Sequence, residues 1–156
     1  ALQEGVKLVF IRHALAPGGV DPNNFNLQDC STQRNLDFNG ISQAKKIGKF
    51  FEENNIQIDQ VLSSEWCRTK DTASNAFGNY KTFNALNSFF STKFFKNREK
   101  QMKDLRRFIY SWNNKKNIVF ITHYVVILEV LDIPVNSGEI VVADKNYKVI
   151  GTIEIN

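Results

Sequence analysis

Two short apolar runs, about 110 residues apart, constrain the fold more than any other part of the sequence. Val9–Ile11 and Val119–Ile121 both read Val-Phe-Ile, and each run is followed by one polar residue and a histidine. Such continuous runs are typical of strands buried on both faces, as in parallel sheets. The ligand crevice of an open α/β sheet lies beyond the carboxyl ends of its strands. The repetition therefore predicts that His13 and His123, the two histidines of the chain, meet at one edge of a sheet.

The rest of the chain alternates between strand and helix patterns. We expect strands at 6–12, 58–63, 81–85, 117–122, 139–144 and 147–155, and helices at 38–54, 65–77, 98–113 and 124–132. This alternation predicts an α/β fold, a three-layer α/β/α sandwich with a mostly parallel sheet. Asp37 and Ser64 are placed to cap the helices that follow them. No segment resembles a linker, so we expect a single domain over residues 1–156.

Composition and charge narrow the classes of partner. The net charge of +4 is spread along the chain, which favours anionic ligands weakly and does not indicate nucleic-acid binding. No run approaches 18 apolar residues, so we expect no membrane span, and no Cys/His cluster has the spacing of a metal site. The chain begins at Ala1 without a hydrophobic leader, so we expect either a removed signal peptide or a trimmed sequence. Whether the protein is cytoplasmic or exported stays open.

The long polar stretch 14–37 starts directly after His13, and we interpret it as an active-site loop. Cys30 lies in this loop and Cys67 lies beside Arg68. Two alternatives stay open for them: free buried thiols, or one disulfide if the protein is exported. A disulfide would pin the loop to the wall of the site.

Two arginines accompany the two histidines. Arg12 precedes His13, and Arg68 falls in the first turn of the helix expected after the second strand. A guanidinium binds phosphate oxygens through two parallel hydrogen bonds, and a histidine can accept a phosphoryl group as a nucleophile. The residues Arg12, His13, Arg68 and His123 together therefore indicate phosphoryl chemistry.

At this point the chain resembles the histidine phosphatase superfamily, which has a phosphoglycerate mutase-like fold. Four segments match motifs of that family in order: Arg12-His13, Leu36–Ala44, Ser63–Ala73 and Thr122-His123. The resemblance covers about residues 6–130, and the length is close to that of the compact SixA-like members.

The resemblance implies a metal-independent phosphatase without a cofactor. His13 would become phosphohistidine, and Arg12, Arg68 and His123 would form the phosphate pocket. To attack, His13 must be neutral, with one ring nitrogen held by a hydrogen bond. The expected substrate is a small phosphorylated molecule or a phosphoprotein, cleaved at a phosphomonoester or a phosphohistidine. The alternative is a catalytically weak module of the same fold that binds phosphorylated ligands.

The chain departs from the family pattern mainly at the proton donor. Ala14 replaces the glycine of the Arg-His-Gly signature, residues 85–90 contain no Glu, and Tyr124 follows His123 where one branch has Asp. We therefore expect another acid. The candidates are Glu65, ranked first and counted among the catalytic residues, followed by Glu139, Asp29 and Asp37.

Loop 14–37 holds a further candidate for anion binding. Arg34 precedes the helix that begins at about residue 38 and is expected to contact the phosphate or another substrate anion. The alternative is a solvated loop arginine.

Overall fold

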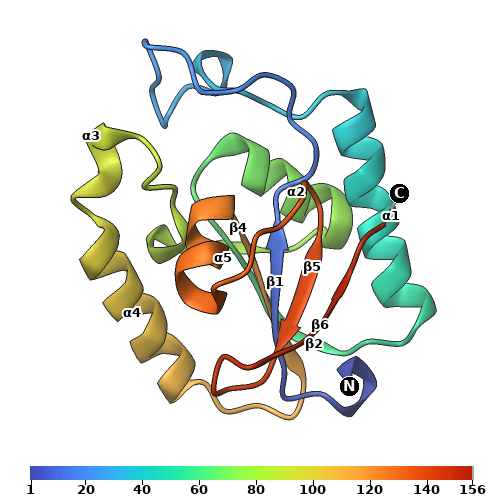
Figure 1. Cartoon of the computed structure of the whole chain (residues 1–156). Helices are drawn as coiled ribbons and strands as arrows, with labels where there is room; N and C mark the ends of the chain where they lie inside the picture. Colours follow the sequence, from blue (N-terminus) through green and yellow to red (C-terminus); the bar gives the residue numbers. More distant parts are fainter. Residues whose placement is uncertain (156) are drawn as a thin grey trace.

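The structure, a computed structural model, describes residues 1–155 (Figure 1). Its centre is a six-stranded sheet with the strand order β3-β2-β4-β1-β5-β6. The strands in chain order are β1 (Leu8–Arg12), β2 (Ile58–Ser63), β3 (Lys81–Thr82), β4 (Asn117–Thr122), β5 (Ile140–Ala143) and β6 (Val149–Ile153). The helices are α1 (Phe38–Glu53), α2 (Cys67–Phe77), α3 (Thr92–Phe95), α4 (Arg98–Ser111) and α5 (Tyr124–Leu131), with single 3-10 turns at Leu2–Glu4 (η1), Cys30–Thr32 (η2) and Asn84–Leu86 (η3).

The sheet is mixed, so the prediction of a mostly parallel sheet is wrong. β3, β2, β4 and β1 pair in parallel, whereas β5 pairs antiparallel with both β1 and β6. Parallel neighbours need a crossover of a dozen or more residues, usually a helix. The connection from β4 to β5 contains α5, but segment 132–139 then returns to the end of β1, where the N–H of Gly138 donates to the carbonyl of His13 (3.0 Å), so β5 runs antiparallel to β1. Only a short turn separates Ala143 from Val149, so β6 pairs antiparallel with β5.

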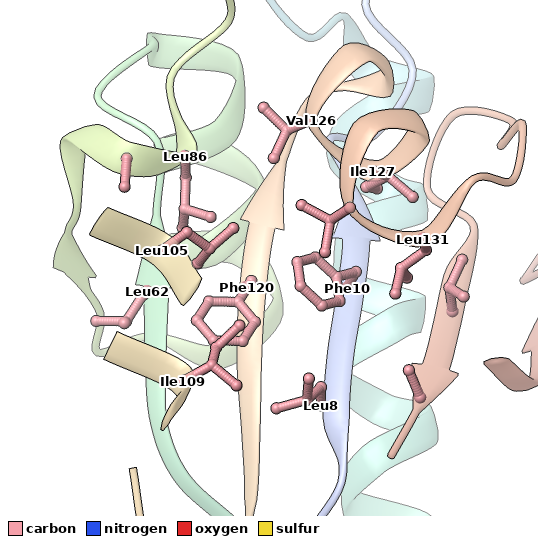
Figure 2. Close-up of a cluster of buried hydrophobic side chains, with 14 of the residues drawn as sticks. Leu8, Phe10, Leu62, Leu86, Leu105, Ile109, Phe120, Val126, Ile127 and Leu131 are labelled. Atoms are coloured by element: carbon pink, nitrogen blue, oxygen red, sulfur yellow. The ribbon is translucent and has the colours of Figure 1, made fainter. Parts of the chain in front are cut away.

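Helices cover both faces of the sheet because side chains of the central strands alternate between them. Leu8 and Phe10 of β1 pack in one cluster with buried residues of α4 and α5 (Figure 2). Val9 and Ile11 point the other way and pack with residues of α1. Because β1 and β4 are buried on both faces, their sequences are continuously apolar.

Two local predictions differ in their outcome. Asp37 caps α1, since its side chain accepts a hydrogen bond from the N–H of Gly40. Ser64, in contrast, does not cap α2, because that helix begins at Cys67 and Trp66 is its N-cap residue. Within residues 1–155, no helix has both the length and the apolar character needed to cross a membrane.

The parallel register of β1 and β4 positions the site. Arg12 is aligned with Thr122 across this pair, so the two strands end side by side. The N–H of His13 donates to the carbonyl of Thr122 (3.0 Å), which continues the ladder by one residue. Loop 14–37 then passes over this end of the sheet (Figure 1).

Candidate active site

The two histidines lie next to each other, as the repeated motif predicts. Their ring centroids are 5.6 Å apart and the ring planes cross at 63°. Both side chains are almost fully buried. Arg12, Arg68 and Arg34 line the same cavity, so five of the six residues predicted for the site come together.

His13 is held in the form that a nucleophile needs. Its Nδ1 lies 2.8 Å from the carbonyl oxygen of Ala14, which can only accept a hydrogen bond, so Nδ1 carries the proton. Nε2 therefore presents its lone pair, to which Nε of Arg68 donates at 3.3 Å. Burial, and after it the charge of Arg68, lower the pKa of His13 well below its usual range.

His123 is anchored through the opposite ring nitrogen. Its Nε2 lies 2.8 Å from Oγ of Ser64, which also accepts the N–H of Trp66 at 3.1 Å. The Ser64 hydroxyl can then donate its proton to Nε2, and this leaves Nδ1 as the protonated nitrogen. Burial and the nearby Arg68 charge also lower the pKa of His123 well below its usual range.

Three buried nitrogens on residues that line this cavity lack a hydrogen-bond partner within the described part of the chain. They are Nε of Arg12, Nε of Arg34 and Nδ1 of His123. Buried polar groups are normally hydrogen-bonded, so three unpartnered nitrogens on the residues of one cavity are unusual. Arginine stays charged in proteins, and the local field is therefore strongly positive.

The arginines differ in how they are held. Nη1 of Arg12 donates to the carbonyl of Val135 (3.0 Å). Nη1 of Arg34 donates to the carbonyls of Ala16 (2.7 Å) and Gly18 (3.1 Å). Part of the Arg34 guanidinium therefore holds loop 14–37 together while its Nε stays without a partner among the described residues.

Asp21 is a site residue that the sequence analysis missed. Its Oδ1 accepts hydrogen bonds from Nη1 of Arg68 and from the N–H of Arg34, both at 2.9 Å. Its Oδ2 accepts a hydrogen bond from Nε1 of Trp66 (3.3 Å). Among residues 1–155, it is the one carboxylate that lines the cavity. No local motif distinguishes Asp21 from the other aspartates of the loop, because only the path of the loop brings it to Arg68.

Of the predicted proton donors, none lines the cavity. Oε1 of Glu65 accepts a hydrogen bond from Nδ2 of Asn87 (2.8 Å). The backbone N–H of Glu65 also donates to Oδ1 of Asn87. Oε1 of Glu139 accepts from the N–H of Asn136. The side chains of Asp29 and Asp37 cap η2 and α1, respectively.

The structure explains why particular residues occur in the segments that match the family motifs. The N–H of Ala14 donates to Oγ1 of Thr72 (2.9 Å), which joins α2 to the segment after β1. A Cβ on Gly40 would lie 2.0 Å from the carbonyl oxygen of Leu15, so only glycine permits this close approach of α1. Ala14 itself does not have a positive φ, which explains why alanine can stand in place of glycine.

The cavity, of about 440 Å³, extends well beyond the histidines and arginines. Its remaining lining residues are Gly19, Val20, Pro22, Asn23, Phe25, Trp66, Ser88, Phe90, Ser91, Lys93, Phe94, Tyr124 and Val125. The site is therefore cationic around the histidines, and the rest of its lining is mostly aromatic and aliphatic, with Lys93, Asn23, Ser88 and Ser91 as further polar side chains. In residues 1–155, no group of three or more His, Cys, Asp or Glu side chains is arranged to hold a metal ion.

Loop 14–37 is fastened to α2 by a disulfide between Cys30 and Cys67. Of the two alternatives left open by the sequence, the structure contains the bridge. Oε1 of Gln33 also accepts the N–H of Cys67 (2.9 Å), so covalent and hydrogen bonds hold the loop at the same place. This attachment brings Asp21 and Arg34 beside Arg68.

Comparison of folds relates the chain to solved structures. The protein histidine phosphatase SixA in complex with tungstate matches with a TM-score of 0.64 and 13% identity, over 95% of this chain and 96% of that one. Phosphoglycerate mutase from Thermus thermophilus matches with a TM-score of 0.64 and 14% identity, over 96% and 99%. The product of the open reading frame Rv3214 from Mycobacterium tuberculosis matches with a TM-score of 0.60 and 15% identity, over 87% and 89%.

No protein-family model matches the chain, and no curated protein sequence is significantly similar to it. The relationship is therefore one of three-dimensional structure. The matches cover nearly the whole of this chain and of the structures compared. The protein has the mixed α/β fold shared by SixA and phosphoglycerate mutase, which is the fold implied by its resemblance to the histidine phosphatase superfamily.

Proposed function

We propose that this protein is a phosphatase that cleaves a phosphomonoester or a phosphohistidine through a covalent intermediate on His13. The observation that carries the proposal is the opposite anchoring of the two histidines. His13 presents a lone pair at Nε2, and His123 presents an N–H at Nδ1. A phosphoryl group needs a nucleophile and donors to its oxygens, and this pair supplies one of each.

The three arginines that line the cavity support an anion as the ligand. A phosphoryl group there can accept hydrogen bonds from the guanidinium groups of Arg12, Arg34 and Arg68. It can also take over the Nε–H of Arg68 that is now directed at His13, and this frees the attacking lone pair. The arginine charges would then offset the charge on the equatorial oxygens in the transition state.

The reaction balances in two displacements. The His13 Nε2 lone pair forms a bond to phosphorus while the bond from phosphorus to the leaving atom breaks, and the leaving group takes up a proton from water. Water then attacks phosphorus, the N–P bond breaks, and its electron pair returns to Nε2. Inorganic phosphate departs, and no step uses a metal ion.

The test is hydrolysis of p-nitrophenyl phosphate in the presence of EDTA, from about pH 4 to about pH 9. We expect turnover by the wild type and a fall of about 10³-fold or more in His13→Ala, because the nucleophile is lost. Tyr110→Ala is the matched control, since this side chain is 88% exposed and lies outside the cavity. Alkaline quenching and mass spectrometry should detect a phosphoryl group on the His13 peptide.

Two results would contradict the proposal. Undiminished turnover in folded His13→Ala would exclude this nucleophile, and loss of turnover with EDTA would exclude a metal-free mechanism. A folded wild type that binds inorganic phosphate but turns over no ester would be the binding module instead.

A further inference from the structure

The apolar end of the cavity is built from stacked aromatic rings. Phe25 stacks on Trp66 with centroids 5.2 Å apart, and Phe94 meets both rings edge to face at 5.8 and 5.4 Å. Trp66 in turn lies edge-on to His123 at 5.3 Å. The aromatic wall, defined as Phe25, Trp66 and Phe94, therefore begins beside the phosphoryl end of the site.

This wall continues outward into exposed apolar side chains. Phe90 is 70% exposed and Val20 is 68% exposed, and both line the same cavity. Apolar side chains that gather at the mouth of a pocket mark a binding surface more often than isolated ones do. A sugar phosphate or a hydroxy acid would need polar partners at this end, where aromatic and aliphatic side chains predominate.

A second observation concerns the leaving group. Asp21, the one carboxylate on the cavity within the described chain, acts as acceptor to Arg68, Arg34 and Trp66 at once. A general acid must donate, and it accelerates such reactions by about 10²–10⁴-fold. A site without one favours leaving groups that depart with a negative charge, and an aryloxide carries that charge far better than an alkoxide.

Building on the proposed function, we propose that the site is specific for phosphate monoesters of aromatic alcohols, with the ring bound against the aromatic wall. Attack by Nε2 of His13 breaks the bond between phosphorus and the aryl oxygen. The aryloxide leaves with the electron pair and is protonated by water, and hydrolysis of the phosphohistidine follows. Phosphotyrosine in a protein and a small aryl phosphate share this chemistry.

The experiment compares kcat/KM for four substrates in the wild type and two variants. The aryl substrates are a phosphotyrosine peptide and 2-naphthyl phosphate. Comparing them distinguishes phosphotyrosine in a protein from a small aryl phosphate as the substrate. The alkyl substrates are the matching phosphoserine peptide and glycerol 2-phosphate. Phe94→Ala removes part of the wall. Phe95→Ala is the control, because the neighbouring Phe95 is 55% exposed and lines an adjoining groove but not the cavity itself.

We expect the wild type to prefer at least one aryl substrate by about 10²-fold or more, the lower end of the range for a missing general acid. In Phe94→Ala the KM for that substrate should rise by about fivefold to tenfold, as expected for a lost aromatic contact. Inhibition by inorganic phosphate should stay unchanged, because the phosphoryl end is intact. Phe95→Ala should behave as the wild type.

Four outcomes would overturn the inference. Equal kcat/KM for aryl and alkyl esters, or an aryl preference that Phe94→Ala leaves intact, would refute it and leave the phosphatase proposal standing. With a phosphohistidine peptide as a fifth substrate, cleavage of that peptide without any cleavage of aryl esters would do the same. Failure to hydrolyse every phosphorylated substrate would refute both proposals together.

Discussion

At the scale of single residues, two histidines with nearly identical sequence contexts are held through opposite ring nitrogens. A backbone carbonyl fixes Nδ1 of His13, whereas the Ser64 hydroxyl fixes Nε2 of His123. The carbonyl contact sets the tautomer of His13, because a carbonyl oxygen can only accept, and the two rings are held through opposite nitrogens. Asp21 adds an internal anion, since it holds Nη1 of Arg68 in a largely buried ion pair.

We predict that Asp21→Asn binds inorganic phosphate more tightly. The substitution removes the charge that competes for Arg68 but keeps an acceptor oxygen for the N–H of Arg34. An increase in affinity of about fivefold, the factor for about 1 kcal/mol, should appear in isothermal titration calorimetry. Asp29→Asn, in the same loop but outside the cavity, serves as the control. Unchanged phosphate affinity with a lower kcat would instead assign Asp21 to proton transfer.

At the scale of elements, loop 14–37 decides the shape of the site. It carries Asp21, Phe25 and Arg34 to the cavity, and the Cys30–Cys67 bridge closes it against α2. The bridged cysteines are 37 residues apart, and a loop of that length is closed at a substantial entropic cost in the reduced protein. The disulfide therefore supports the fold and the site together.

We predict that Cys30→Ser lowers the free energy of unfolding by about 4 kcal/mol at 25 °C, the loop-closure value for this separation. The KM for p-nitrophenyl phosphate should rise, because Arg34 is no longer held beside Arg68. Urea unfolding and steady-state kinetics check both parts. Dithiothreitol should reproduce these effects in the wild type and leave the variant unchanged. A denatured, unreduced wild type with two free thiols would show that the bridge does not form.

At the scale of the whole molecule, the burial of both histidines links stability to pH. The pKa of His13 and that of His123 lie well below 6.5 in the folded protein because burial disfavours the charged rings. The unfolded chain then binds more protons than the folded one at any pH between the folded-state pKa and about 6.5. Stability contributed by the neutral rings is present above about pH 6.5 and is lost as the pH falls.

We predict that the free energy of unfolding falls below about pH 6.5, with each histidine contributing up to about 1.4 kcal/mol per pH unit. His123→Asn should remove one of the two contributions and make the dependence shallower. Urea unfolding at several pH values between about 5 and about 7.5 measures both slopes, and the carboxylates contribute equally to the two proteins. If the free energy of unfolding of the wild type and that of His123→Asn changed with pH by the same amount, the contribution assigned to His123 would be wrong.

The sequence by itself determined the parts of this protein that depend on short-range patterns. The runs at 9–11 and 119–121 predicted buried strands, and a shared sheet edge then followed for His13 and His123. The helix capped by Asp37 was also predictable, because its cap and apolar face lie within a few residues of each other.

Tertiary structure alone decided the rest. The mixed sheet depends on which strand β5 pairs with, and strand pairing is a contact between distant segments. The position of Asp21, the isolation of Glu65 from the cavity and the disulfide all depend on the path of a long loop. Neither hydrophobic periodicity nor turn chemistry specifies such a path, because many conformations of a polar loop satisfy the same local preferences. Contacts with α2 select one of them, and that selection completes the candidate site.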